Sequence, residues 1–440
     1  MELHDEFVIA KQTVPVVKNC DVVVVGGGIA GISAAVSAAR NGMHVVLIEK
    51  SIVLGGLATL GNVCIYLALC DGCGNKVYGG LAEELLHETI RYGYDNLPDC
   101  WRGRPSRLEA PAGRYRTQFN VPAAIFAFDE MMEREGVEVV FDTVFSEPIL
   151  EGRECKGVIV ENKSGRTAYM AKMVVDASGD CDVFARAGAD CVTAENLVSF
   201  WCHELNFDVM RKGISRGSMI DAVRIRWIGQ NACSDNSGTE LPTFTGCDSE
   251  SRNEYIKLSR RLAREYLKAH KRADYAMLTM PFTPQFRTTR SIRSKVPFVP
   301  VPEKYEPNSV GCVVDSIKPH APVYELPYEA LLSGQFDNMI AAGRTVGGSK
   351  EAWELTRFIP ACAFTGQVAG LAAALAVKRG KTLHDLEVGT LQDMLANSGI
   401  ILHLTEAMRL ENKTKRQYVN DALGDQNIVS ESVILRESHH

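Results

Sequence analysis

The strongest hydrophobic pattern in the chain lies between residues 21 and 50. Residues 22–25 are four consecutive valines, and an unbroken run of β-branched residues is typical of a strand buried on both faces. The small residues at 30–39 predict a helix that begins near Ile29 and ends at Asn41-Gly42. Residues 44–48 form a second apolar run, which predicts another strand. The order strand, helix, strand indicates an α/β fold with a parallel sheet.

The turn between this first strand and the helix has the spacing GxGxxG, formed by Gly26, Gly28 and Gly31. In such a unit the first glycine allows a tight turn, and the second lets backbone amides approach a pyrophosphate. The third glycine lets the helix pack closely on the strand. Because the unpaired amides at a helix start attract phosphates, Ile29 and Ala30 belong to the predicted site.

An acidic residue stands where the second strand ends. Glu49 follows the last glycine at close to the ~20 residues at which an acid meets a ribose hydroxyl, and Lys50 comes directly after it. The complete unit therefore predicts dinucleotide binding. It does not decide between NAD and FAD.

Other predicted strands also end in small residues, and ligands bind beyond the carboxyl ends of strands in open α/β sheets. We expect residues 137–141 to form a strand that leads to Val144, and residues 172–177 to form a buried strand. The further residues predicted to contact the nucleotide follow such strands: Gly55, Gly56, Leu57, Ala58 and Thr59 after the second strand, Val144 after the strand at 137–141, and Ala177, Ser178 and Gly179 after the last one.

The remaining pattern predicts helices at residues 79–91, 122–135, 218–228, 254–271 and 383–396. Residues 146–150, 157–161 and 167–171 predict a small antiparallel meander with a turn at 162–165. The first twenty residues predict a short arm that pairs with a sheet edge through residues 7–9 or 14–17.

Length and composition indicate a globular protein of about two domains. The chain has 440 residues, 46% of them hydrophobic, and a net charge of −6, which argues against a nucleic-acid surface. The apolar stretch at 359–377 contains proline, glycine and polar residues, so we expect a buried helix, the alternative being a membrane-associated one. Because a lipid-facing helix has little reason to combine these residues, we expect no membrane partner.

Thirteen cysteines are scattered singly, without a signal peptide before them, which favours free thiols in a reducing cytoplasm. Cys70 and Cys73 form a CxxC pair, but there is no second pair and no nearby pair of histidines. We therefore expect no metal site, and ordinary thiols rather than a thiol-reactive pair. The loop at residues 92–113, rich in arginine and aromatic residues, fits a functional loop and a solvated insertion equally well.

Several motifs together resemble a known family. They are VVVVGGGIAGISAA, LIEK, GGLAT and GGLAEELL, then RTQFNVPAAIFAFDEMM and MVVDASGDCDVFARAGA, then PFTPQFRTTRSIRS, YELPYEALL and FDNMIAAGRTVGGSKEAWELTRFIPACAFTGQVAGLAAALAV. In this order, over residues 21–399, the chain resembles FAD-dependent oxidoreductases related to the flavoprotein subunits of succinate dehydrogenase and fumarate reductase. The motifs near the two ends are specific, whereas the middle of the match is loose.

The resemblance implies a Rossmann-like FAD domain of the glutathione-reductase type with an inserted substrate-capping domain. The implied domains are an arm at 1–20, an FAD domain at 21–190 and 311–400, a cap at 191–310 and a C-terminal segment at 401–440. The flavin ring is expected between the Gly55-Gly56 loop and a later segment that contributes Gly343, Arg344, Thr365 and Gly366. A helix beginning near residues 359–365 would aim its amides at the ring.

The chemistry of the substrate is expected between the cap and the flavin. Arg287 and Arg290 suit carboxylate or carbonyl oxygens because a guanidinium donates two parallel hydrogen bonds. Arg290 is expected to hold an anionic substrate oxygen, and the alternative is that it anchors the insert by pairing with a carboxylate. His203 is a candidate general acid or base, although a lone histidine is more often structural.

These observations predict an enzyme that transfers a hydride between FAD and a small organic substrate with a carboxylate or carbonyl group. Two alternatives remain: a flavoprotein subunit of a larger electron-transfer complex, and an RNA-modifying flavoprotein. The sequence is also compatible with a homo-oligomer or a separate electron-transfer partner.

Overall fold

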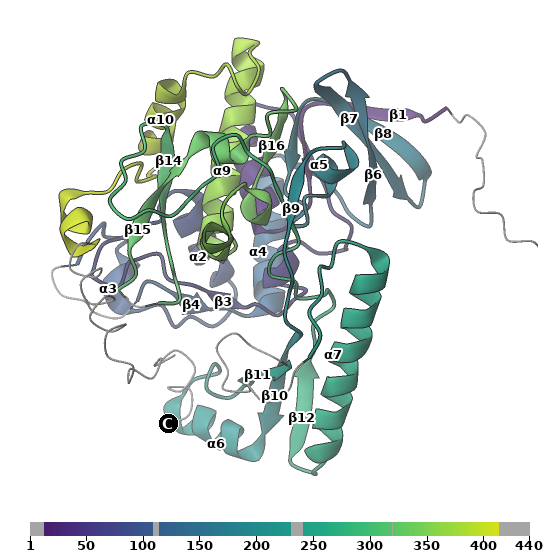
Figure 1. Cartoon of the computed structure of the whole chain (residues 1–440). Coiled ribbons are helices and arrows are strands. Elements are labelled where there is room, and N and C mark those ends of the chain that lie inside the picture. The colour runs from purple at the N-terminus through teal and green to yellow at the C-terminus, as the bar shows by residue number, and fades with distance from the viewer. Residues whose placement is uncertain (1–12, 109–113, 230–240, 319, 413–440) are drawn as a thin grey trace, which may run out of the picture.

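The computed structural model describes residues 13–108, 114–229, 241–318 and 320–412. Its largest element is a seven-stranded sheet with the order β5-β2-β1-β8-β7-β6, in which β16 also pairs with β8 (Figure 1). The strands are β1 (Val16–Val25), β2 (Val45–Ile48), β5 (Glu138–Val140), β6 (Val144–Glu151), β7 (Glu154–Asn162), β8 (Gly165–Asp176) and β16 (Met339–Ala341). The predicted α/β class and the strands near residues 22–25 and 44–48 are confirmed.

The sheet joins a parallel half to an antiparallel meander through one long strand. β5, β2, β1, β8 and β16 run parallel, whereas β6 and β7 run antiparallel to their neighbours. The predicted meander and its turn at 162–165 are confirmed. The prediction of two strands at 167–171 and 172–177 was wrong, because no turn residue interrupts the extended chain and β8 is continuous.

The N-terminal arm contributes more to the sheet than the sequence predicts. β1 begins at Val16, and its first half pairs with β8 through partners such as Cys20 and Ala171. The expected edge pairing near residues 14–17 is thus confirmed as an extension of β1, and residues 7–9 lie outside the described residues.

β1 is buried on both faces, as its four valines predict. Val22 and Val24 belong to the core shared with helices α1 (Ile29–Arg40) and α9 (Ile359–Arg379). Val23 and Val25 belong to a second core with the meander and helix α5 (Asp182–Arg186). Strand alternation therefore divides one apolar run between two layers.

Helix α9 is the one helix in the described part of the chain that is long and apolar enough to cross a membrane. Of its most apolar window, 94% is buried inside the protein. A Cβ atom on Gly366 would lie 2.2 Å from the carbonyl oxygen of Ala30, and one on Gly370 would lie 2.1 Å from that of Ala34. The glycines of α9 thus allow close packing on α1, and the interpretation of residues 359–377 as a buried helix is confirmed.

The remaining elements of the main body surround these layers. They are η1 (Gly56–Ala58), β3 (Ile65–Tyr66), α2 (Leu81–Thr89), α3 (Asp99–Arg102), β4 (Thr117–Gln118), α4 (Val121–Arg134), β14 (Ser309–Val314), β15 (Val323–Pro327), η2 (Tyr328–Leu331), η3 (Gly343–Thr345), α8 (Lys350–Thr356) and α10 (Val388–Asn397). The helices predicted at 79–91, 122–135 and 383–396 are confirmed as α2, α4 and α10.

Residues 194–289 form an inserted domain that leaves and re-enters the main body through two paired strands, β9 (Cys191–Thr193) and β13 (Arg290–Ile292). The insert contains β10 (Ser199–Asn206), α6 (Phe207–Arg216), β11 (Arg224–Gly229), α7 (Ser249–Ala269) and β12 (Tyr275–Thr279). Its sheet has the order β11-β10-β12, and the long helix α7 lies along it (Figure 1). The helix predicted at 254–271 is confirmed as α7.

The helix predicted at 218–228 was wrong. The Asn206 side chain caps α6 by accepting a hydrogen bond from the amide of Val209, and Gly217 ends it in the left-handed conformation. Residues 224–229 then alternate between the two faces of a strand, so Arg224 and Arg226 both reach Glu204 on β10. Pairing with β10 overrides the local helical pattern.

Candidate functional site

The carboxyl ends of β1, β2, β8 and β16 meet at one edge of the sheet, here called the carboxyl edge. The amide of Gly26 donates to Ile48 at 2.8 Å, that of Ala177 to Val25 at 3.0 Å, and that of Ala342 to Asp176 at 3.0 Å. The chain moves from β1 outward to β2 and β5, then returns to β8 on the opposite side of β1. This change of direction is the position at which open α/β sheets bind ligands.

The three glycines of the GxGxxG turn occupy very different surroundings. A Cβ atom on Gly26 would lie 2.5 Å from the Ala177 carbonyl oxygen, and one on Gly31 would lie 1.8 Å from the Gly26 carbonyl oxygen. At Gly28 the same atom would have no described protein atom within 4 Å. Packing therefore requires the first and third glycines, whereas the second faces open space that suits a ligand.

The start of α1 has the electrostatic character that a pyrophosphate needs. Gly28 precedes the helix, and the structure shows no side-chain cap there and no acid in the first turn among the described residues. The dipole of this 12-residue helix and the amides near Ile29 and Ala30 therefore remain to attract an anion. The residues fit a bound dinucleotide.

Glu49 is buried at the end of β2 and holds the glycine turn. Its carboxylate accepts hydrogen bonds from the amides of Gly27 and Ser51, both at 2.7 Å. The backbone of Glu49 also accepts from Thr143, which places Val144 at the start of β6 beside it. Lys50 is exposed at the same strand end. The ribose contact of Glu49 stays a prediction.

The loop at residues 55–64 lies against the same turn. The amide of Gly55 donates to the carbonyl of Gly27 at 2.8 Å, and a Cβ atom on Gly56 would approach the Cα of Gly28 to 3.1 Å. The Thr59 hydroxyl donates to Leu54 at 2.6 Å, and Ala58 is buried. The loop residues from Gly55 to Thr59, Leu57 included, thus line the approach to Gly28.

Gly343 connects the carboxyl edge to the start of α1 and to the second turn of α9. Its amide donates to the Thr365 hydroxyl at 2.9 Å, and a Cβ atom on it would lie 2.9 Å from the Ala30 side chain. The glycine has a φ of 73°, in the left-handed region that favours glycine. Gly343 therefore contacts both the start of α1 and the second turn of α9, whereas Gly366 is explained by helix packing.

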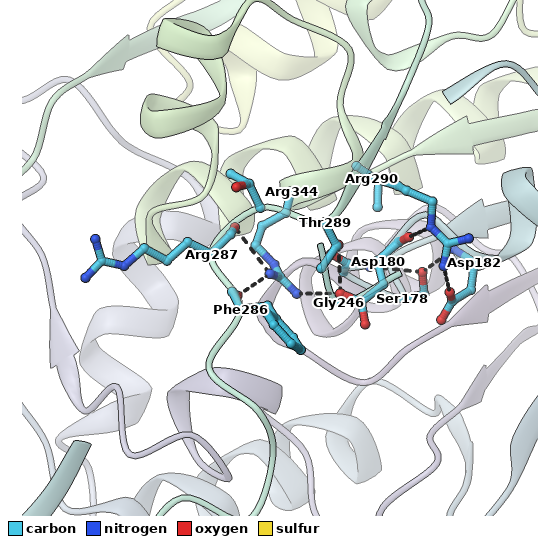
Figure 2. A network of polar contacts seen from close by, with 12 residues as sticks. Ser178, Asp180, Asp182, Gly246, Phe286, Arg287, Thr289, Arg290 and Arg344 are labelled. Carbon is cyan, nitrogen blue, oxygen red and sulfur yellow. Dashed lines mark hydrogen bonds and ion pairs between the residues drawn. The ribbon is translucent and has the colours of Figure 1, made fainter. Parts of the chain in front are cut away.

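Asp180, just beyond β8, links the main body to the inserted domain (Figure 2). Its carboxylate lies 3.3 Å from the Arg344 guanidinium and 3.1 Å from Arg252 of α7, and it accepts from the Thr289 hydroxyl at 2.9 Å. Burial alone would raise the pKa of Asp180, but the positive charges of Arg344 and Arg252 hold that pKa below its ordinary value. The sequence places Ser178 and Gly179 in the site but misses Asp180.

The two candidate arginines point in different directions. Arg290 donates to the carbonyl of Asp180 at 3.0 Å and to the carboxylate of Asp182 at 2.8 Å, at the hinge between β9 and β13. The side chain of Arg287 extends away from this network (Figure 2). The placement of Arg290 is the one expected of an anchor, and its role in substrate binding stays a prediction.

His203 brings the inserted domain to the 55–64 loop. Its Nδ1 lies 2.9 Å from the Thr279 hydroxyl of β12, and its Nε2 lies 3.3 Å from the Sγ atom of Cys64. Burial lowers the pKa of the imidazole and raises the pKa of the thiol to about 12, so both groups favour their neutral forms. Nothing in the sequence distinguishes Cys64 from the other cysteines.

Two further hydrogen bonds seat the inserted domain on the same loop. The amide of Phe282 donates to the carbonyl of Leu60 at 2.7 Å, and the Gln285 side chain donates to the carbonyl of Gly61. The side-chain oxygen of Gln285 (Oε1) in turn accepts a hydrogen bond from the backbone amide of Trp201 on β10 at 2.8 Å. The insert therefore lies against the loop that lines the approach to Gly28.

This fold and site define a dinucleotide-binding α/β protein with an inserted domain over the carboxyl edge of its sheet. The family model for FAD dependent oxidoreductases matches residues 21–199 and 306–395 and leaves the insert between them unmatched. The chain belongs to the FAD dependent oxidoreductase family. It is an enzyme, and its cofactor is FAD.

Relatives match over short stretches. A thioredoxin reductase of Ureaplasma parvum is 33% identical over 75 residues, 17% of this chain and 24% of that protein. A fumarate reductase (cytochrome) of Shewanella frigidimarina is 42% identical over 79 residues, 18% of this chain and 14% of that protein. The matched stretch is thus less than a quarter of the length of either relative.

A solved structure covers much more of the chain at lower identity. The p-nitrophenol 4-monooxygenase of Pseudomonas putida is 13% identical, covers 92% of this chain and 97% of its own, and has a TM-score of 0.48.

Proposed function

We propose that this protein transfers a hydride between FAD and a small organic substrate that carries a carboxylate or carbonyl group. The substrate would lie between the inserted domain and the 55–64 loop. The observation that supports the proposal is the contact of His203 with Cys64, which joins a titratable side chain of the insert to the loop proposed to line the FAD site.

The residues proposed to hold FAD surround the carboxyl edge. The start of α1 would bind the pyrophosphate, Glu49 and Val144 would lie at the adenosine end, and Gly343 with Thr365 would lie at the flavin end. FAD, when bound, accepts or donates a hydride through its flavin ring. The protein supplies the orientation and the electrostatics around that ring.

Arg287 is the proposed binding residue for the substrate anion. It lies two positions after Gln285, whose side chain contacts the 55–64 loop, and its guanidinium extends away from the Asp180 network (Figure 2). A guanidinium binds a carboxylate with two parallel hydrogen bonds and polarises a carbonyl oxygen. Arg290, whose guanidinium is bonded to Asp182, is proposed to anchor the insert instead.

His203 is the proposed proton acceptor or donor. A histidine with a lowered pKa is neutral near pH 7 and can accept a proton from a substrate hydroxyl or carbon. The Thr279 hydroxyl fixes the orientation of the ring through Nδ1, which leaves Nε2 directed at the 55–64 loop. The proposal assigns positioning to Thr279 and proton transfer to His203.

Anaerobic mixing of the purified FAD-loaded protein with small acids, ketones and enones tests the proposal. We expect at least one carboxylate or carbonyl compound, or its reduced form, to change the flavin absorption spectrum within seconds. Arg287→Ala should slow that change at least ~10-fold with unchanged FAD content. A flavin that responds only to quinones or to a protein partner would overturn the proposal.

We also propose a reducing compartment such as the cytoplasm. The described cysteines are all free thiols, including Cys181 and Cys191, whose sulfur atoms are 3.8 Å apart without a bond. Free, closely spaced thiols are typical of reducing conditions. Thiol titration of the protein after anaerobic lysis should find these two cysteines reduced.

A further inference from the structure

We propose that Asp71, Cys73, His320 and Glu411 form a binding site for a divalent transition metal, with zinc the preferred ion. None of these residues belongs to the FAD or substrate site described above. Asp71 and Cys73 lie in the loop after β3, His320 lies between β14 and β15, and Glu411 lies in the helical turn at residues 406–412. Three distant segments thus supply the four side chains.

Three of the donor atoms lie near one another, and the His320 imidazole lies beside one of them. One oxygen of Asp71, one oxygen of Glu411 and the sulfur of Cys73 all lie within 4.8 Å of one another. The Nδ1 atom of His320 lies 3.4 Å from the same sulfur. Zinc bonds of about 2.3 Å to sulfur and about 2.0 Å to nitrogen or oxygen place neighbouring ligands roughly 3.5 Å apart. His320 is outside the group of three mutually close donor atoms, so its imidazole must turn toward the carboxylates to become the fourth ligand.

The kinds of donor atom select the metal. A thiolate and an imidazole are typical zinc ligands, whereas calcium and magnesium prefer sites made of oxygen atoms alone. With Cys73 ionised, the sulfur and the two carboxylates bring three negative charges together beside a neutral imidazole. A divalent cation offsets most of that charge, and one of the carboxylates, that of Asp71, is fully buried.

The surrounding hydrogen bonds orient the proposed ligands. The Asp71 carboxylate accepts from the amides of Cys73 at 2.8 Å and Asn75 at 3.1 Å. The side-chain amide of Asn75 donates to both Asp71 and Glu411, so one residue holds the two carboxylates toward the same point. Residues around a metal site usually hold the ligands in orientation by such hydrogen bonds. Arg107 lies 3.5 Å from the other oxygen of Glu411 and partly neutralises it.

The site explains why the CxxC spacing alone is misleading. Cys70 is buried in the core and accepts a hydrogen bond from the amide of Tyr115, whereas Cys73 is partly exposed and faces His320. A second CxxC pair would be needed for a zinc site of the common four-cysteine kind. Here the other proposed ligands, His320 and Glu411, lie 247 and 338 positions after Cys73. With four protein ligands the site would be closed and structural, and the metal would tie the segment around Glu411 to the main body.

Metal binding to the full-length FAD-loaded protein tests the inference. After treatment with a chelator and its removal, zinc is titrated against a chromophoric competitor, and cobalt is added separately as a spectroscopic probe. We expect one tight zinc site per chain and a thiolate-to-cobalt charge-transfer band. Cys73→Ala and His320→Ala should each weaken zinc binding at least ~100-fold, and Cys73→Ala should remove the band.

Two matched variants control for other cysteines and histidines. Cys70→Ala removes a thiol from the same loop and His44→Ala removes an exposed histidine, and both should retain the tight site when their FAD absorbance shows that they are folded. Zinc binding that is equally tight in Cys73→Ala and the wild-type protein, or no tight binding in either, would overturn the inference. So would a cobalt spectrum without a thiolate band in the wild-type protein.

Discussion

At the scale of single residues, the surroundings of each glycine separate packing from ligand binding. Gly26 and Gly31 cannot carry a side chain because backbone oxygens lie too close, whereas a side chain on Gly28 would enter open space. Gly28 has a φ of −70° and a ψ of 179°, a conformation that any residue adopts. The described protein atoms therefore give no reason for glycine at this position, and glycine is the residue expected if the cofactor lies there.

This contrast predicts that Gly28→Val abolishes FAD retention without unfolding the protein. The valine side chain would occupy the space that the pyrophosphate needs, so flavin content should fall at least ~10-fold. Circular dichroism should show the helix content of the wild-type apoprotein. Gly31→Val is the matched contrast, because its Cβ would meet the Gly26 carbonyl oxygen and the fold itself should fail. A yellow Gly28→Val protein would count against the site.

His203 predicts a pH dependence of stability. Burial lowers its pKa in the folded protein, so the unfolded chain binds the proton more readily. The stability that the neutral ring contributes is present above the unfolded pKa of about 6.5 and is lost as the pH falls through the lower folded value. Between pH 7.5 and 5, the melting temperature should therefore fall further in the wild-type protein than in His203→Gln.

The difference in melting temperature between the wild-type protein and His203→Gln separates the effect of His203 from the effects of other titrating groups. Burial raises the pKa of Asp176 to about 6, which makes the protein less stable as the pH rises, the opposite direction. Asp176 is present in both proteins, so its effect cancels in the comparison. Parallel melting curves across this range would mean that His203 does not titrate differently in the folded and unfolded states.

At the scale of elements, the β9–β13 pair is the two-stranded connection, here called the hinge, through which the chain enters and leaves the inserted domain. Arg290 begins β13 and is bonded to Asp182 at the start of α5, so it ties this hinge to the main body. The sequence motif around Arg290 is compatible with both substrate binding and anchoring. Its side-chain partners favour anchoring.

We therefore expect Arg290→Ala to lower the melting temperature by a few degrees with little change in the rate of flavin reduction. Loss of a partly buried ion pair and one backbone hydrogen bond corresponds to about 1–2 kcal/mol of unfolding free energy. Arg287→Ala should show the opposite emphasis: a slower reaction is expected in the protein that stays folded. Differential scanning calorimetry and stopped-flow absorbance on the same preparations measure both. A loss of reaction rate confined to Arg290→Ala would reverse the two assignments.

At the scale of the whole molecule, local patterns predict the main body better than the insert. The strand, glycine turn and helix at residues 22–40 are contiguous, so their geometry follows from short-range packing. The contact between His203 and Cys64 joins residues 139 positions apart, and no motif or spacing in the sequence predicts it. The misplaced helix at 218–228 shows the same limit, because pairing with β10 decides that segment.

The direction in which a charged side chain points cannot be predicted from the local sequence either. Arg287 and Arg290 differ by three positions, yet one extends away from the Asp180 network and the other anchors the hinge (Figure 2). Asp180 follows small residues that the pattern assigns to the nucleotide site. Its actual partners come from α7, from η3 and from the segment before β13.

Asp180→Asn should loosen the inserted domain from the main body. The substitution keeps the size of the side chain but removes the negative charge that lies between Arg344 and Arg252, leaving two cations close together in a partly buried position. Removing one partner of such a cluster costs about 2–4 kcal/mol and leaves the dinucleotide residues of α1 untouched. We expect retained FAD, a melting temperature lower by several degrees, and flavin fluorescence that iodide quenches more strongly because the insert opens. Asp337→Asn, which breaks an exposed ion pair with Arg153, is the control and should change none of these by a comparable amount. Iodide quenching equal to that of the wild-type protein would show that Asp180 stabilises the fold without holding the insert over the cofactor.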